Sequence, residues 1–303
     1  MGVTVKNLFR LQDLSQLGHF KPGGAIIELG AQELYCKGLE QSVANFLNSF
    51  ATNQSFLADD ELIVKLANRG FTSELFKHSG FSYKALDIFD GDEVILFDLN
   101  LETPGLELKG NFDLVTNFGT TEHVINQYAS FKTIHELTKQ GGIIYHDLPM
   151  GGYHTHGYFN YNPLFFQHLA SANNYEILFH WYSRSSVYTN APELMQNNGF
   201  GENWTDMGIE YIFLKTTDEP FRMPLETGTS LALNPNVWHG SDPYGKGLLM
   251  PAPDSEAQLG QLRALKDARS ANISLRLREF SGWDLQREVL KRYKARLTRL
   301  LGN

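Results

Sequence analysis

The sequence contains a single cysteine, Cys36, among its 303 residues. One cysteine cannot form a disulfide within the chain, and it excludes a zinc site built from several thiolates. No apolar run approaches the roughly 18 residues that a membrane-spanning helix needs. Lys6 and Arg10 are not followed by an apolar run either, so no signal peptide is predicted. We therefore expect a cytoplasmic protein, and a role at the membrane is not favoured.

Basic residues are scarce over most of the chain. There are 26 Lys and Arg against 34 Asp and Glu, which gives a net charge of −8. Residues 261–303 hold 11 of the basic and 4 of the acidic residues, so residues 1–260 hold 15 and 30. Proteins that bind phosphate backbones need a basic surface, and the acidic main body therefore argues against nucleic acid as a partner.

Strand and helix patterns alternate along the chain. Hydrophobic residues make up 42% and charged residues 20% of the sequence, which is typical of a globular protein. Short apolar runs predict buried strands, and longer stretches with helical spacing separate them. We expect strands at 24–31, 83–88, 93–99, 112–118, 143–148, 176–182 and 210–215, and helices at 33–50, 59–68, 72–78, 124–139 and 162–173.

This alternation predicts an α/β fold, a mainly parallel sheet with helices on both faces. Residues 23–234 would form this domain, after an N-terminal extension at 1–22. A loop or linker at 235–254 and a C-terminal helical appendage at 255–303 would follow. Ligands of such sheets bind beyond the carboxyl ends of the strands.

Short motifs stand in order at the predicted strand ends. The first strand ends in Glu28-Leu29-Gly30, and later strands carry Asp87 and Asp98. FDLVTNFGTTEHV and KTIHELTKQGGIIYHDLP follow at 112–124 and 132–149. None of these pieces is specific alone, but their order resembles the class I S-adenosylmethionine-dependent methyltransferases. The resemblance covers residues 23–216 and implies a Rossmann-like sheet whose last strand is antiparallel, with S-adenosylmethionine as cofactor and S-adenosylhomocysteine as product.

The chemistry of this cofactor fits those positions. Glycine lets backbone approach its methionine part, and an acidic side chain can accept hydrogen bonds from both ribose hydroxyls. Free N–H groups at the start of a following helix can hold its carboxylate, and an apolar slot can hold the adenine. The resemblance implies cofactor contacts from Glu28, Gly30, Gln32, Asp87, Asp98, Leu99, Asn117 and Phe118.

The first loop departs from the family pattern. The family usually has acid-x-Gly-x-Gly-x-Gly, whereas Gln32 and Leu34 stand at the second and third glycine positions here. The segment between Gly30 and Asp87 is also long. One consequence of this departure would be weak or lost binding of the cofactor. The alternative role for Glu28 and Asp87 is to cap a helix or anchor a loop.

The loop after the last central strand is rich in histidine, with His146, His154 and His156. A neutral imidazole there could take a proton from an acceptor hydroxyl, and His154 or His156 is the preferred base. His-x-His near Asp147 could also bind a divalent metal, but no metal ligand is assigned, and a polar loop without chemistry is the third alternative. His123, in Glu-His-Val, is expected to pack and to anchor its loop.

Aromatic residues accompany these histidines. Tyr153, Tyr158 and Tyr161 interleave with them, and Trp204 precedes the last strand. All four are candidates for the wall of an acceptor pocket. The C-terminal segment shows an apolar stripe opposite Lys and Arg, which favours packing on the acidic body or on a second copy, as a homo-oligomer, over membrane binding.

The leading hypothesis is methyl transfer to a small-molecule acceptor, a hydroxyl of a sugar, polyketide or other secondary metabolite. The histidines favour oxygen, because a hydroxyl gains more from a base than a neutral amine does. A non-catalytic scaffold or binding protein that keeps the fold is the alternative, and the missing glycines support it. A nicotinamide-dependent oxidoreductase ranks last because the first loop lacks Gly-x-Gly-x-x-Gly.

Overall fold

The computed structural model describes residues 2–50, 60–153, 155–184, 187–189 and 206–224. All of them belong to the first of the two units into which the chain divides, Met1–Ala252. The second unit, Pro253–Asn303, lies outside the described residues. The predictions made for His154, for Trp204, for the linker at 235–254 and for the C-terminal helical appendage also fall outside them.

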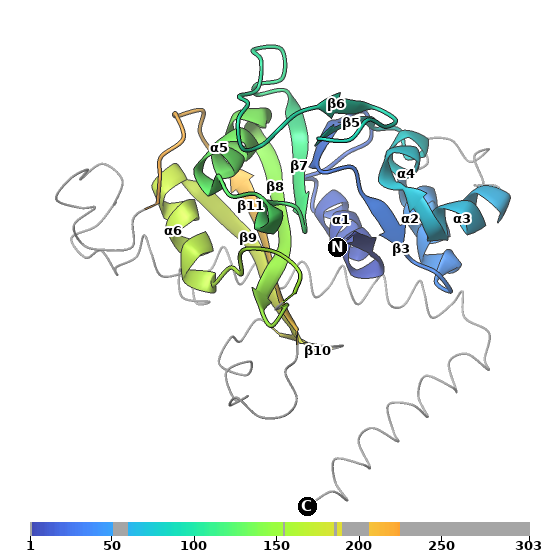
Figure 1. Ribbon diagram of the computed structural model, residues 1–303. Coiled ribbons are helices and arrows are strands. Elements are labelled where there is room, and N and C mark those ends of the chain that lie inside the picture. Colours follow the sequence, from blue (N-terminus) through green and yellow to red (C-terminus); the bar gives the residue numbers. More distant parts are fainter. Residues whose placement is uncertain (1, 51–59, 154, 185–186, 190–205, 225–303) are drawn as a thin grey trace, which may run out of the picture. The chain divides into compact units, whose positions relative to one another are not determined.

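The centre of the described part is an eight-stranded sheet with the order β10-β9-β11-β8-β7-β2-β5-β6 (Figure 1). The strands from β8 to β6 pair in parallel, whereas β11 runs antiparallel to both β8 and β9, and β10 runs antiparallel to β9. The mainly parallel α/β sheet predicted from the sequence is thus confirmed, including its antiparallel last strand. The strands are β2 (Ala25–Leu29), β5 (Ser82–Asp87), β6 (Val94–Leu96), β7 (Phe112–Phe118), β8 (Thr138–Gly151), β9 (Tyr175–Arg184), β10 (Val187–Thr189) and β11 (Met207–Lys215).

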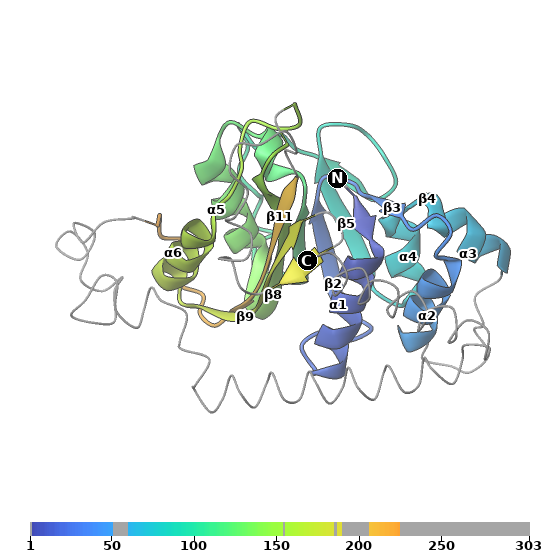
Figure 2. The same ribbon diagram turned by 90° about the horizontal axis from the view of Figure 1, so that it is seen from below.

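Two helices cover one face of the sheet, α5 (Gln127–Leu137) and α6 (Pro163–Asn173) (Figure 2). Both begin at an asparagine cap: Asn126 accepts from the Ala129 N–H, and Asn162 accepts from the Phe165 N–H ahead of a proline in the first turn. These caps explain why α5 begins three residues later than its apolar pattern suggests. The core between these two helices and the sheet includes Phe131, Ile134, Leu137, Phe166, Leu169, Tyr211 and Phe213.

Four helices belong to the other part of the domain: α1 (Val5–Gln16), α2 (Glu40–Phe50), α3 (Asp60–Ala67) and α4 (Thr72–His78). Figure 2 shows α1, α2 and α4 on the opposite side of the sheet from α5 and α6. Among their buried side chains are Phe46, Phe50 and Phe76. Phe50 packs edge-on against Phe20 and Phe81, which stack on each other with ring centroids 4.3 Å apart. Within the described residues, no helix combines the length and the apolar character needed to cross a membrane.

The segment after β2 differs from its prediction. A helix was expected at 33–50, but residues Glu33–Tyr35 form strand β3, and α2 begins only at Glu40. The strand β3 pairs with β1 (Val3–Thr4) and with β4 (Asn68–Phe71) in a small separate sheet. Pairing partners this distant in sequence override local helix propensity. The chain therefore leaves Gly30 as a strand, and no helix begins there.

The N-terminal residues are integrated into this fold. Lys6 and Asn7 of α1 reach Asp147 on β8, with the Lys6 Nζ 2.9 Å from Asp147 Oδ1 and the Asn7 Nδ2 2.8 Å from Asp147 Oδ2. Lys6 also lies 3.1 Å from Glu210 Oε1 on β11. Residues 1–22, predicted as an N-terminal extension, thus contain β1, which pairs with β3, and α1, which contacts the central sheet through these polar side chains.

Candidate functional site

A cavity of about 550 Å³ opens at the carboxyl ends of β2, β5 and β7. This is the edge where ligands of parallel α/β sheets bind. The cavity is lined by the loop after β2, the loop after β5, the segment around Asp98 and the turn after β7. Its lining residues are Gly30, Ala31, Gln32, Glu33, Tyr35, Arg69, Leu86, Asp87, Ile88, Phe89, Phe97, Asp98, Leu99, Asn100, Gly119, Thr120, His123 and Val124.

Gly30 turns the chain at the end of β2. Its φ of +76° lies in the left-handed region, where side chains are strained, and its N–H donates to the Leu86 carbonyl at 2.8 Å. A Cβ at this position would lie 2.8 Å from Thr120 Oγ1. Gln32 folds back onto the same turn, with Nε2 3.1 Å from the Gly30 carbonyl oxygen and 3.3 Å from Thr120 Oγ1. The turn at Gly30 is therefore closely packed against Thr120 and Gln32.

Two carboxylates also line the cavity, those of Asp87 and Asp98. Asp87 accepts hydrogen bonds from the Ala31 N–H at 2.9 Å and from the Phe89 N–H at 3.0 Å, one on each oxygen. Asp98 accepts from the Asn100 N–H at 2.8 Å. These bonds fix both carboxylates, and each oxygen of Asp87 keeps a lone pair for a further donor.

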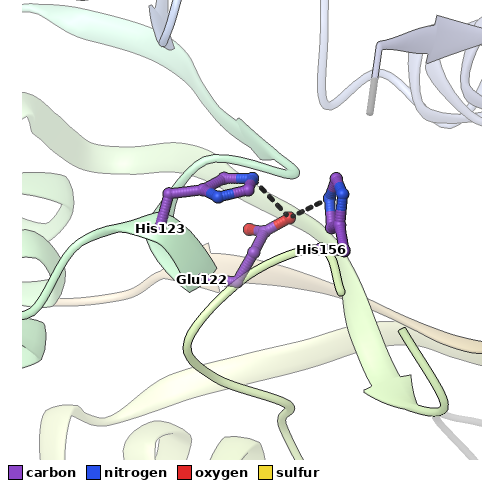
Figure 3. Close-up of side chains that lie close together, drawn as sticks. All are labelled: Glu122, His123 and His156. Atoms are coloured by element: carbon purple, nitrogen blue, oxygen red, sulfur yellow. Dashed lines mark ion pairs between the residues drawn. The ribbon is translucent and has the colours of Figure 1, made fainter. Parts of the chain in front are cut away.

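A cluster of Glu122, His123 and His156 adjoins the cavity (Figure 3). Glu122 and His123 belong to a short 3₁₀ helix after β7, Thr121–His123, and His156 belongs to the loop after β8. Both imidazole rings point at one carboxylate oxygen, Oε1 of Glu122, with the His156 Nε2 at 3.4 Å and the His123 Nε2 at 3.8 Å. His123 also lines the cavity, so the cluster and the cavity share a wall.

Burial controls the ionisation of this cluster. The Glu122 side chain is 0% exposed, and loss of hydration raises its pKa to about 7. Burial also lowers the pKa of the His123 and His156 imidazoles below the usual range. The cluster thus combines an easily protonated carboxylate with two imidazoles that are mostly neutral near pH 7.

Comparison with known protein families gives one match, in the central part of the chain. A family model described as a methyltransferase domain matches residues 67–200, a range that contains Asp87, Asp98 and Glu122. Residues 67–200 of the chain thus resemble a methyltransferase domain. The resemblance to class I methyltransferases is thereby confirmed. No protein with a curated description matches the sequence.

Solved structures similar to this chain share little sequence with it. The 1,6-didemethyltoxoflavin N1-methyltransferase of Burkholderia thailandensis, bound to its substrate and S-adenosylhomocysteine, is 12% identical, with a TM-score of 0.39 and coverage of 69% of this chain and 79% of that one. A methyltransferase from Archaeoglobus fulgidus is 12% identical, with a TM-score of 0.37 and coverage of 68% and 91%. Phosphoethanolamine N-methyltransferase 2 of Haemonchus contortus is 13% identical, with a TM-score of 0.34 and coverage of 70% and 57%.

The predicted cofactor residues fall into two groups. Gly30, Gln32, Asp87, Asp98 and Leu99 line the cavity. The other three are buried and do not line it: Glu28, Asn117 and Phe118. The residues that line the cavity stand at the last position of a strand or after it. The three buried residues belong to β2 and β7.

Glu28 is held inside the protein by hydroxyl groups. The Thr72 and Tyr83 hydroxyls donate to its Oε2 at 2.5 and 2.7 Å, so it joins β2, α4 and β5. Its pKa is raised to about 7 because burial disfavours the charged form. These contacts give Glu28 a structural role, and direct cofactor contact by its side chain stays an untested prediction.

Replacing Glu28 by Gln is expected to remove a pH dependence of stability. Because the folded protein binds this proton more tightly than the unfolded chain, the parent loses stability as pH rises from about 4.5 to about 7 and then levels off. The shift corresponds to at most about 3 kcal/mol, so the variant should be the more stable protein at pH 8 by up to that amount. Urea unfolding at pH 5 and pH 8 measures this. Glu107→Gln, at an exposed position, is the control, and parallel pH profiles for parent and Glu28→Gln would contradict the expectation.

The predicted catalytic and substrate residues are dispersed. His146 is fully buried among rings of α5 and α6, where its Nδ1 lies 3.1 Å from Asn117 Nδ2 and burial lowers its pKa to about 3. His156 is in the cluster described above. Tyr161 is buried and donates to Gln127 Oε1 at 2.6 Å. Tyr153 is partly buried, whereas Tyr158 is 70% exposed.

Three residues of the site were missed or underrated by sequence reasoning. His123 was expected to pack and anchor, but its side chain is 45% exposed and lines the cavity. Glu122 received no role, although it is the fixed centre of the cluster. Arg69 lines the cavity and donates from Nε to Glu33 at 2.7 Å. The adjacent Glu122 and His123 could have been recognised from the sequence as candidate site residues. No spacing in the sequence, however, indicates that His156 lies beside them.

Proposed function

We propose that this methyltransferase domain binds S-adenosylmethionine in the 550 Å³ cavity and transfers its methyl group to a hydroxyl of a small molecule. The observation that carries the proposal is that Gly30 and Asp87 lie at the ends of two adjacent strands and both line one cavity at the carboxyl edge of the sheet. The family match over residues 67–200 supports it independently. The cavity and the family match support binding of the cofactor, and the choice of a hydroxyl acceptor rests on Glu122, His123 and His156 beside the cavity.

Each part of the cofactor has a matching group on the cavity wall. The free lone pairs of Asp87 would accept from the two ribose hydroxyls. Phe97, Leu99 and Val124 supply the apolar surface that an adenine requires. The backbone around Gly30 would lie against the methionine part, and the Arg69 guanidinium would attract its carboxylate. This last role is suggested because no helix N-terminus follows Gly30.

The bound cofactor would supply an activated methyl group on a sulfonium. The acceptor oxygen would bond to the methyl carbon while the carbon–sulfur bond breaks, and its electron pair would stay on sulfur in S-adenosylhomocysteine. The residues of the chain would align the two molecules and exclude water, which are the main requirements of this reaction. The hydroxyl proton would leave toward the cluster of Glu122, His123 and His156.

The proposal of an oxygen acceptor rests on that cluster. His156 is the predicted catalytic histidine that the structure describes beside the cavity region, and Glu122 lies 3.4 Å from its Nε2. A hydroxyl needs help to lose its proton, whereas a neutral amine can attack first and lose its proton later. The role of His156 as a general base stays a prediction.

Replacing Asp87 by Ala is expected to weaken binding of S-adenosylhomocysteine about 10- to 150-fold, the equivalent of ~1.5–3 kcal/mol for hydrogen bonds to a charged group. The loss has two physical sources, the ribose contacts and the bond that fixes Ala31. Titration calorimetry on the full chain measures it.

Two variants make this result specific. Asp87→Asn keeps an oxygen for the Ala31 N–H and should bind more tightly than Asp87→Ala but less tightly than the parent. Asp90→Ala removes an exposed carboxylate from the same loop, outside the cavity lining, and should bind as the parent does. Equal affinity of Asp87→Ala and the parent would remove Asp87 from the site.

A non-catalytic protein with the same fold is the second candidate. The observation that favours it is the chain path after Gly30, which enters strand β3 where a carboxylate-binding helix start was expected. Such a protein would bind neither S-adenosylmethionine nor S-adenosylhomocysteine. The calorimetric titration of the parent separates the two candidates.

A further inference from the structure

Glu122 is a buried carboxylate without a hydrogen-bond donor. Neither of its oxygens has a hydrogen-bond partner among the described residues, although the side chain is 0% exposed. A carboxylate in this situation is costly, and a native structure normally compensates it with hydrogen bonds, an opposite charge or a metal ion. The groups that face it are the imidazoles of His123 and His156.

The three side chains converge on one point. One ligand atom from each lies within 4.8 Å of the others, and the two imidazole rings are 4.7 Å apart at an angle of 73°. A metal bound at ~2.0–2.2 Å from each ligand atom needs those atoms roughly 3.0–3.5 Å apart. The distance of 3.4 Å between Glu122 and His156 already fits. The distance from Glu122 to His123 is 3.8 Å and the three ligand atoms lie within 4.8 Å of one another, so the imidazole rings would draw closer on binding an ion.

We propose that Glu122, His123 and His156 bind a divalent transition-metal ion. Two imidazoles and one carboxylate form a donor set that suits zinc, manganese, iron, cobalt or nickel, whereas magnesium and calcium prefer oxygen ligands alone. Three protein ligands also leave coordination positions open, as in catalytic sites rather than closed structural ones.

The backbone holds the three ligands together. The Tyr158 and Phe159 N–H groups donate to the Glu122 carbonyl at 2.7 and 3.2 Å, which ties the loop after β8 to the 3₁₀ helix after β7. Gly157 lies so close that an added Cβ would be 2.7 Å from Glu122 Cγ. His156 is therefore placed beside Glu122 by main-chain contacts that do not depend on the imidazole itself.

The site would face the cavity through His123, which belongs to both. An ion with open positions there could bind an acceptor hydroxyl and lower its pKa, so that the proton leaves to water. This consequence rests on the proposed function, whereas binding of the ion does not. His156 would then serve as a ligand and not as the general base.

The test uses the untagged full chain, stripped with a chelator and titrated with Co²⁺, whose visible absorption reports nitrogen and oxygen ligands, and with Zn²⁺ and Mn²⁺ by calorimetry. We expect one ion per chain at this site. Glu122→Gln, His123→Asn and His156→Asn should each weaken its affinity by more than about tenfold. His78→Asn, at an exposed position on α4, is the matched control and should bind as the parent does.

The choice of variants also separates loss of a metal ligand from loss of the fold. His123 and His156 are exposed enough to be replaced without loss of the fold, which circular dichroism would check. Equal affinities for the parent and these two variants, or no binding of any of the three ions, would overturn the metal site. Loss of Co²⁺ binding in His123→Asn and His156→Asn, with retention in His78→Asn, would support it.

A parallel titration with S-adenosylhomocysteine keeps the two proposals apart. Cofactor binding without metal binding would leave the proposed function intact and reject the metal site. Metal binding without cofactor binding would support the metal site and reject the proposed function. If no ion binds and His156→Asn still slows methyl transfer by more than tenfold, the imidazole acts as the base and the metal site is rejected.

Discussion

Replacing Lys6 by Met is expected to lower the free energy of unfolding by about 3–5 kcal/mol, the usual cost of removing one partner from a buried ion pair. The Lys6 Nζ lies 2.8 Å from Asp147 Oδ2 and 3.1 Å from Glu210 Oε1, and the two carboxylate side chains are only 10% and 2% exposed. Burial alone would lower the pKa of Lys6, but the two carboxylates raise it above its usual value. Without the ammonium group, both carboxylates would remain buried and repel each other.

Urea unfolding followed by circular dichroism at pH 7 measures this loss. The matched control is Lys84→Met, because Lys84 pairs with Glu93 at the surface, where both side chains are at least one-third exposed. Such a pair contributes about 0–1 kcal/mol. Adding Asp147→Asn and Glu210→Gln to Lys6→Met should recover much of the loss, since neutral amides are less costly to bury. A Lys6→Met effect as small as that of Lys84→Met would contradict the account of how α1 is attached.

Replacing Gly30 by Val is expected to weaken S-adenosylhomocysteine binding by more than about 100-fold, or ~2.7 kcal/mol. A side chain at φ +76° is strained, and its Cβ would lie 2.8 Å from Thr120 Oγ1 and 3.1 Å from Gln32 Nε2. The turn must therefore shift, and it forms the wall against which the methionine part would lie.

Calorimetry measures the affinity, and a second glycine separates strain from site geometry. Gly38 has nearly the same backbone angle, φ +77°, but open space around an added Cβ and no place in the cavity lining. Gly38→Val should therefore lose stability without losing cofactor affinity. If Gly30→Val is folded and binds as the parent does, the cavity is not the cofactor site.

The sequence predicts the central sheet well, because each strand carries its own apolar run. The run 112–118 coincides with β7, whereas β8 extends beyond the run expected at 143–148 and β10 was not predicted. The helix expected at 33–50 was wrong in its first turns, since β3 forms by pairing with Val3–Thr4 and with β4. The role of the N-terminus was missed for the same reason, as Lys6 and Asp147 are 141 positions apart.

The candidate site likewise contains residues that the sequence predicts and residues that depend on contacts between distant segments. Gly30 and Asp87 could be predicted because parallel strands place their carboxyl ends at one edge. Glu122 and His156 could not be paired, because their approach depends on the hydrogen bonds of Tyr158 and Phe159 to the Glu122 carbonyl. The burial of His146 follows from alternation: Tyr145 and Asp147 contact α1, so His146 faces α5 and α6.

The most direct test of the account is a calorimetric titration of the full chain with S-adenosylhomocysteine, with Asp87→Ala alongside. The account predicts one binding site per chain in the parent and an affinity about 10- to 150-fold lower in the variant. Absence of binding in a folded parent protein would contradict the proposed methyl transfer and leave a non-catalytic protein with a methyltransferase fold.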